Sequence, residues 1–151
     1  MSLRTFSVLT AAIAAVVISS SFALAQTPAV TVHDAWVREP MGGRNVTGAF
    51  AVVENAGTTG KAIVAASSDV SDKVELHEMK NEGGKMSMSP VKKMDVPAKG
   101  KLELKPGSFH VMLFDVKKKL TDGEKISLTF TFDDGSKVTT EAQVRKAGMM
   151  Q

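Results

Sequence analysis

Short runs of apolar and β-branched residues, separated by glycine, proline and asparagine, recur along this chain and restrict it to β-structure. The clearest run, residues 125–132 (KISLTFTF), alternates strictly, and Asp133-Asp134-Gly135 after it is typical of a hairpin turn. No helical periodicity longer than two turns appears after residue 25. We therefore expect an all-β fold, an antiparallel Greek-key β-sandwich. The predicted strands cover residues 30–38, 47–54, 61–67, 73–80, 85–89, 91–95, 101–105, 108–116, 125–132 and 137–144.

The first 25 residues have the pattern of a secretory signal peptide. Arg4 precedes a mostly apolar stretch over residues 6–18, and Ala23-Leu24-Ala25 fits the rule for cleavage between small residues. The apolar run is short for a membrane span, which needs about 20 residues. We predict a signal peptide at 1–25, a single domain at 26–151 with a flexible tail at 146–151, a periplasmic location and no membrane span after signal removal. No cysteine follows the predicted cleavage position, which argues against a lipid anchor.

Histidine and methionine are concentrated between His77 and Met112. This stretch holds two of the three histidines and five of the nine methionines. Because residues i and i+2 share one face of a strand, each dyad in it would present two soft or borderline metal ligands together. One methionine alone in a β-protein is usually core filling, but the recurrence of dyads indicates a soft-metal site. The dyads are His77/Met79, Met86/Met88 and His110/Met112.

A hairpin turn at residues 81–84 would bring two of these dyads together. If Lys80 faces Lys85, antiparallel pairing places Met79 opposite Met86 and His77 opposite Met88. We therefore predict that these four side chains share one face. His110 and Met112 must join them from a later strand.

The ligand types select the metal. Thioether sulfur and neutral imidazole nitrogen favour Cu(I). A zinc site would require cysteine, more histidine or carboxylate ligands, and a calcium site would require clustered oxygen ligands. A blue-copper centre requires a cysteine thiolate, and the chain contains no cysteine. Cu(II) could bind more weakly through the histidines.

Other classes of function find little support. With few histidines and no recognisable nucleophile motif, the chain is not expected to be an enzyme. It has no tyrosine, no aromatic platform and no basic helix, so no nucleic-acid partner is expected. The formal net charge is +3, and Lys117-Lys118-Lys119 is read as a solvated face or, less simply, as a docking patch for an acidic partner.

Several residues outside the dyads receive structural interpretations. Trp36, the single tryptophan, is expected to anchor the core, and Met94 to pack in it. His33 is interpreted as structural and Met41 as a surface residue of a glycine-flanked loop. Met149 and Met150 lie in the predicted tail, where they could act as an extra copper ligand pair.

The chain resembles the periplasmic copper chaperone family called PCu(A)C. The family's ligand pattern is His, ten residues, Met, twenty-one residues, His, one residue, Met, and the chain meets it without insertion. The flanking sequence also resembles that of the family over nearly the whole chain after residue 25. It includes DAWVR at 34–38, VELHEM at 74–79, MSMSPV at 86–91, VPAKGKLELKPGSFHVML at 96–113 and SLTFTF at 127–132.

The resemblance implies a cupredoxin-like β-sandwich and a function. It implies that His77, Met88, His110 and Met112 bind Cu(I) for delivery toward the CuA centre of cytochrome c oxidase. The expected partners are cytochrome c oxidase subunit II, a Sco-type protein, or both. Met79 and Met86 lie outside the matched pattern and are expected as auxiliary ligands. A chaperone site should face solvent near one end of the sandwich.

Two alternatives remain open on the sequence. One is a periplasmic copper buffering or resistance protein with the same site and no dedicated acceptor. The other is an exported adhesion or assembly sandwich whose methionines only pack, in which case the sulfur atoms of Met88 and Met112 should be buried.

Overall fold

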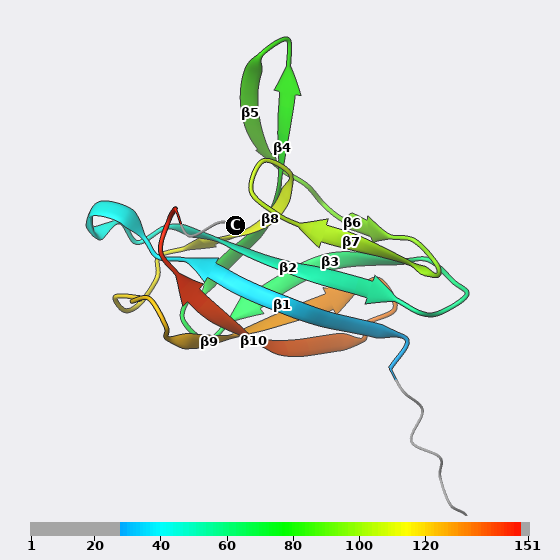
Figure 1. The fold of residues 1–151 in the computed structure, drawn as a ribbon. Helices are drawn as coiled ribbons and strands as arrows, with labels where there is room; N and C mark the ends of the chain where they lie inside the picture. The colour runs from blue at the N-terminus through cyan, green and yellow to red at the C-terminus, as the bar shows by residue number, and fades with distance from the viewer. Residues whose placement is uncertain (1–27, 149–151) are drawn as a thin grey trace, which may run out of the picture.

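The computed structural model describes residues 28–148, which form strands joined by turns, by longer loops and by one 3-10 turn (Figure 1). Between residues 28 and 148 there is no α-helix, so the predicted all-β class is confirmed. The elements are β1 (Val30–Arg38), η1 (Met41–Gly43), β2 (Thr47–Asn55), β3 (Lys61–Ser68), β4 (Lys73–Glu82), β5 (Lys85–Pro90), β6 (Met94–Val96), β7 (Gly100–Leu104), β8 (Phe109–Phe114), β9 (Lys125–Phe132) and β10 (Lys137–Arg145).

The strands follow the order β5-β4-β8-β2-β1-β10-β9-β3-β6, and β7 also pairs with β2. The sheet is mixed, because β1 and β10 run parallel while the other named pairs in the described part of the chain are antiparallel. This parallel pair departs from the purely antiparallel prediction. It is compatible with the topology because parallel neighbours need a long connection, and nearly the whole domain lies between β1 and β10.

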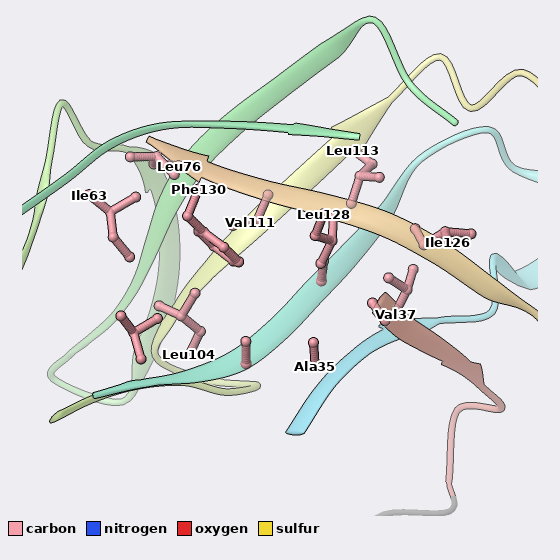
Figure 2. Packing of buried hydrophobic residues seen from close by; sticks show 14 of the residues in the cluster. Ala35, Val37, Ile63, Leu76, Leu104, Val111, Leu113, Ile126, Leu128 and Phe130 are labelled. Atoms are coloured by element: carbon pink, nitrogen blue, oxygen red, sulfur yellow. The ribbon is translucent and has the colours of Figure 1, made fainter. Parts of the chain in front are cut away.

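The sheet curls so that β3 lies against β4, and the core fills the space between the two layers (Figures 1 and 2). The strict alternation of β9 is seen in its burial: its apolar residues are buried and those between them are half-buried or more exposed. Met94 is 1% exposed and packs in the core, as predicted. The largest fully buried side chains are Phe130, Phe132, Ile63, Met94, Leu113, Leu120, Leu128, Val37, Val53, Val96, Val111 and Val144.

A β-bulge in β1 reverses which side chains point inward. The pairing with β2 shifts between His33 and Trp36, and Asp34 adopts a positive φ of 52° there. Val30 is buried before the bulge, whereas Ala35 and Val37 are buried after it. Trp36 therefore lies half-buried on the outer face and outside the core cluster, so the prediction that it anchors the core is wrong.

The β4–β5 hairpin projects from the body of the fold, and every residue of β5 is exposed (Figure 1). Its turn is shorter than predicted, because Gly83 and Gly84 alone connect the strands at φ values of 61° and 84°. Two consecutive positive φ values are typical of a type I′ hairpin turn.

The shorter turn corrects the predicted register. Met79 faces Met88, Asn81 faces Met86 and His77 faces Pro90. The shift equals two residues, and side chains alternate with a period of two. The four predicted residues therefore keep a common face although their partners differ from those predicted.

Some predictions fall on residues outside the described part of the chain. They are the signal peptide at 1–25, the end of the predicted tail, Met149 and Met150. Among residues 28–148, no helix is long and apolar enough to span a bilayer.

Truncating Leu113 tests the inner face of β8. Leu113 is fully buried, so Leu113→Ala should reduce the free energy of unfolding by about 2–5 kcal/mol through lost transfer energy and a cavity. Val64 is 41% exposed on β3, and Val64→Ala should change that free energy by only about 0.5 kcal/mol. Urea unfolding of both variants measures the contrast, and equal losses would contradict this assignment of the core.

Candidate metal centre

The pairing of β4 with β8 brings the two sequence-distant histidines together. His77 and His110 are direct partners in this antiparallel ladder, and their ring centroids are 5.9 Å apart. Glu75 faces Met112 one step further along the same ladder. Since opposed residues of a ladder share one face, the predicted hairpin and the later strand meet on one side of the sheet.

The inner residues of the same strands explain why this face is outward. Leu76, Val111 and Leu113 are buried in the core between the layers (Figure 2). Strand alternation then forces His77 and His110 to the opposite side. Burial of the apolar side chains on one face of each strand thus positions the polar side chains on the other face.

His110 presents one ring nitrogen toward methionine sulfur. Its Nδ1 donates to the Ser108 carbonyl at 2.9 Å, and because a carbonyl only accepts, the neutral ring carries no hydrogen on Nε2. This Nε2 lies 3.2 Å from the Met88 Sδ. Burial lowers the pKa of His110 below 6.5, although the Ser108 carbonyl opposes the shift. The neutral ring that a metal requires is therefore favoured.

His77 is oriented by a carboxylate. Its Nε2 lies 2.9 Å from the Glu75 Oε2, and hydrogen bonding to His77 is the main reason that the pKa of Glu75 lies below 4.5. An ionised carboxylate only accepts, so the Nε2 donates and the neutral ring leaves Nδ1 unprotonated. That Nδ1 is buried and makes no hydrogen bond within the described part of the chain. An unsatisfied buried nitrogen of this kind is available to a metal ion.

Exposure divides the site into two sides. His77 and His110 are only 7% and 5% exposed, whereas Met86 and Met88 are 48% and 50% exposed. The predicted solvent-facing site is therefore open on its methionine side and covered on its histidine side. The packing alternative required the sulfur atoms of Met88 and Met112 to be buried, whereas the Met88 residue is 50% exposed and Met112 is half-buried.

A mostly apolar pocket of about 530 Å³ opens beside His110, whereas His77 does not line it. Phe50 lies in its wall, with its ring centroid 6.2 Å from that of His110. Met41 is 64% exposed, and although it was interpreted only as a surface residue, its loop places it on this pocket. The methionines lining the pocket are Met41, Met79, Met86, Met88 and Met112.

Other candidate ligands lie elsewhere. The Nδ1 of His33 is 2.8 Å from Asp34 and its Nε2 is 3.2 Å from Glu54, and these contacts raise its pKa. They agree with its interpretation as structural. Across residues 28–148, no group of three or more histidines and carboxylates is arranged to hold a metal ion. The donors that line the pocket are mainly imidazole nitrogen and thioether sulfur, with Glu39 as its one carboxylate, and the nitrogen and sulfur donors suit a soft monovalent ion.

Glu75, which precedes His77 by two residues, was not identified as a site residue from the sequence. The i, i+2 spacing of a carboxylate and a histidine on one strand was the signal that could have identified it as the orienting partner. Ser108 and Phe50 were not singled out, because a backbone carbonyl contact and a cross-strand neighbour leave no local pattern.

Sequence comparison identifies relatives over most of the described chain. The LpqE-like family, whose description is that of lipoproteins, matches residues 30–144. Lxx21020 of Leifsonia xyli subsp. xyli, named as a lipoprotein, is 38% identical over 120 residues, which are 76% of this chain and 71% of that protein. The uncharacterized protein RP573 of Rickettsia prowazekii is 33% identical over 86 residues, which are 54% of this chain and 46% of that protein.

Solved structures share the fold. The copper-bound PCuAC domain from PmoF2 superposes with a TM-score of 0.67 at 20% identity, covering 81% of this chain and 97% of that domain. The apo PCuAC domain from PmoF1 gives a TM-score of 0.68 at 24% identity, with 81% and 98% covered. Apo-DR1885 from Deinococcus radiodurans gives a TM-score of 0.62 at 26% identity, with both chains covered completely.

These neighbours confirm the predicted cupredoxin-like β fold, and the family agrees with the prediction that the chain is not an enzyme. The chain belongs to the LpqE-like family, and the resemblance of its sequence to the PCuAC copper chaperones is confirmed.

Proposed function

We propose that this protein is a Cu(I) metallochaperone whose cargo is held by His77, Met88, His110 and Met112. The observation that carries the proposal is the pairing of His77 with His110, each oriented through one nitrogen so that the other is unprotonated. The 3.2 Å contact between His110 Nε2 and Met88 Sδ supports a mixed nitrogen and sulfur donor set. Met112 lines the same pocket.

The donor chemistry supports copper in the monovalent state. Thioether sulfur is soft and uncharged, and imidazole is borderline, so together they favour Cu(I) over zinc or calcium. Cu(II) would bind more weakly, through the histidines. Two structural neighbours are described as copper-bound: the PmoF2 domain and, with Cu(I), DR1885.

The division between a covered histidine side and an open methionine side suggests how copper would leave. Thioethers on flexible, exposed side chains are the ligands that an acceptor can replace first. The histidines, held by Glu75 and the Ser108 carbonyl, would keep the ion until the acceptor's ligands complete the exchange.

Met79 and Met86 are proposed as auxiliary ligands on this open side. Met79 faces Met88 across the hairpin, and Met86 is one pair further along. Both line the pocket, so either can contact an ion that has left the main site.

The ligand assignment predicts a contrast between two double variants. Met88→Ala/Met112→Ala should weaken Cu(I) binding by more than the roughly 10–100-fold that loss of an orienting partner costs, because ligands themselves are removed. Met79→Ala/Met86→Ala removes the same number of thioethers and should weaken binding far less. Anaerobic competition with a Cu(I) chelator measures both. Equal retention by the Met88/Met112 variant and the wild type would show that the assignment is wrong.

Binding should depend on pH through the histidines. A proton and Cu(I) compete for the same imidazole nitrogen, and the pKa of His110 is lowered from 6.5 by burial. Affinity should therefore stay level from about pH 8 to about pH 6.5 and decline below that range. The competition titration repeated across this range tests it. A response that stays flat well into the acidic range would argue against histidine ligation.

We further propose that the protein is exported through a signal peptide at residues 1–25, acts in the periplasm and delivers copper toward the CuA centre of cytochrome c oxidase. The proposed acceptors are subunit II, a Sco-type protein, or both. The proposal extends the family resemblance and the character of residues 1–25.

Deleting the gene distinguishes delivery from buffering. Delivery predicts lower copper content in the CuA centre and reduced oxidase activity, restored by the wild-type chain and not by the Met88→Ala/Met112→Ala variant. Copper sensitivity with a normally assembled oxidase would instead assign the protein to copper buffering. Metal analysis of the purified oxidase is the decisive measurement.

A further inference from the structure

The arginines of the described chain lie around the same pocket. Arg38 and Arg44 line it, and Arg145 is the Cα partner of Arg38 on the neighbouring strand. None of the three lies within 4.0 Å of a carboxylate oxygen among residues 28–148.

Lysines of the same chain behave differently. Nine of them form ion pairs, including Lys117 with Asp72 and Lys118 with Glu124. Carboxylates are therefore not scarce on this surface, and the lysine run considered as a docking patch is largely neutralised. Six other lysines also form no ion pair among residues 28–148, but no lysine lines the pocket, so the unpaired cationic groups beside it are the arginines.

Two of these arginines stack on an aromatic pair. The Cζ of Arg145 lies 5.8 Å from the ring centroid of Trp36, and the Cζ of Arg38 lies 5.6 Å from that of Phe50. Trp36 and Phe50 stack on each other at 4.4 Å. A guanidinium held over a ring keeps its N–H edge available for a planar acceptor, and stacking reduces the entropy lost when that acceptor binds.

The bulge in β1 creates this arrangement, because it turns Trp36 to the outer face, where Arg38 also lies two residues later. The Nε of Arg38 is a buried donor without a hydrogen bond in the described residues. Such a donor is normally satisfied, so it points to an acceptor supplied from outside.

We propose that Arg38, Arg44 and Arg145, with Trp36 and Phe50, form a docking surface, the arginine face, for a partner protein segment that carries both carboxylate and apolar side chains. The carboxylates would bind the guanidinium groups through paired N–H···O bonds, and an apolar side chain would enter the pocket. Arginine and tryptophan are the residues that most often dominate binding energy at interfaces.

The composition of the pocket selects this occupant. Half of its lining residues are methionine, proline or phenylalanine, and Glu39 is the single carboxylate residue lining it in the described chain. An acidic and apolar segment complements both properties. The identification of that partner as a copper acceptor rests on the proposed function, whereas binding of an acidic segment does not. Docking here would place the partner beside the exposed methionines.

The test uses a short capped peptide in which glutamate alternates with valine and methionine, and a twin with glutamine at every glutamate. Trp36 is the single tryptophan of the chain, so its fluorescence reports binding at the arginine face, with backbone amide shifts in NMR as a second readout. The wild type should bind the glutamate peptide at least about tenfold more tightly than the glutamine twin, and added salt should weaken the binding.

Arg44→Gln/Arg145→Gln is the informative variant, because both side chains are exposed and neither change disturbs the half-buried Arg38. It should weaken peptide binding by at least about tenfold. Lys99→Gln/Lys137→Gln removes the same charge from exposed positions that do not line the pocket, and it should leave binding within about twofold of the wild type.

Three results would overturn the proposal. They are equal binding of the two peptides, equal effects of the arginine and lysine variants, and binding of phosphatidylglycerol vesicles at Trp36 in place of the peptide. Chelator competition on the same samples should show unchanged Cu(I) retention in both variants. Failure of the wild type to retain copper would count against the proposed function alone.

Discussion

The antiparallel pairing of β4 with β8 is the interaction on which the candidate site depends. Its register decides that Leu76, Val111 and Leu113 enter the core, and the same register sets His77 opposite His110 on the outer face. Because strand side chains alternate, the burial of one set fixes the position of the other. A slip by one residue would expose the core side chains and bury the histidines, so core stability and site geometry are held by the same hydrogen bonds.

The two sides of the site differ in how firmly they are held. Each histidine is buried and oriented through one nitrogen, by Glu75 for His77 and by the Ser108 carbonyl for His110. The methionines of β5 extend from a projecting hairpin and are about half exposed. A buried, hydrogen-bonded nitrogen side with an exposed sulfur side fits an ion that must be held in transit and then released.

Two small backbone features shape the surface around this site. The bulge at Asp34 turns Trp36 outward onto Phe50, and the two-glycine turn sets Met79 opposite Met88. Each involves only one or two residues, yet each changes which side chains are presented on the surface to a binding partner. The bulge creates an aromatic and cationic surface, and the turn places sulfur atoms along the hairpin.

The β class, most strand positions, the inward face of β9 and the common face of the hairpin ligands could be predicted from the chain alone, because alternation and turn residues are local signals. Spacing and ligand type also indicated a soft-metal site, and the resemblance to the PCu(A)C pattern identified the four residues that we propose as copper ligands. The folded arrangement was needed to show that the hairpin meets β8, that the turn has two residues, that β1 pairs parallel with β10 and that Trp36 lies outside the core. These outcomes depend on pairing between strands distant in sequence and on a bulge that reverses side-chain direction, and neither leaves a periodic trace in the chain.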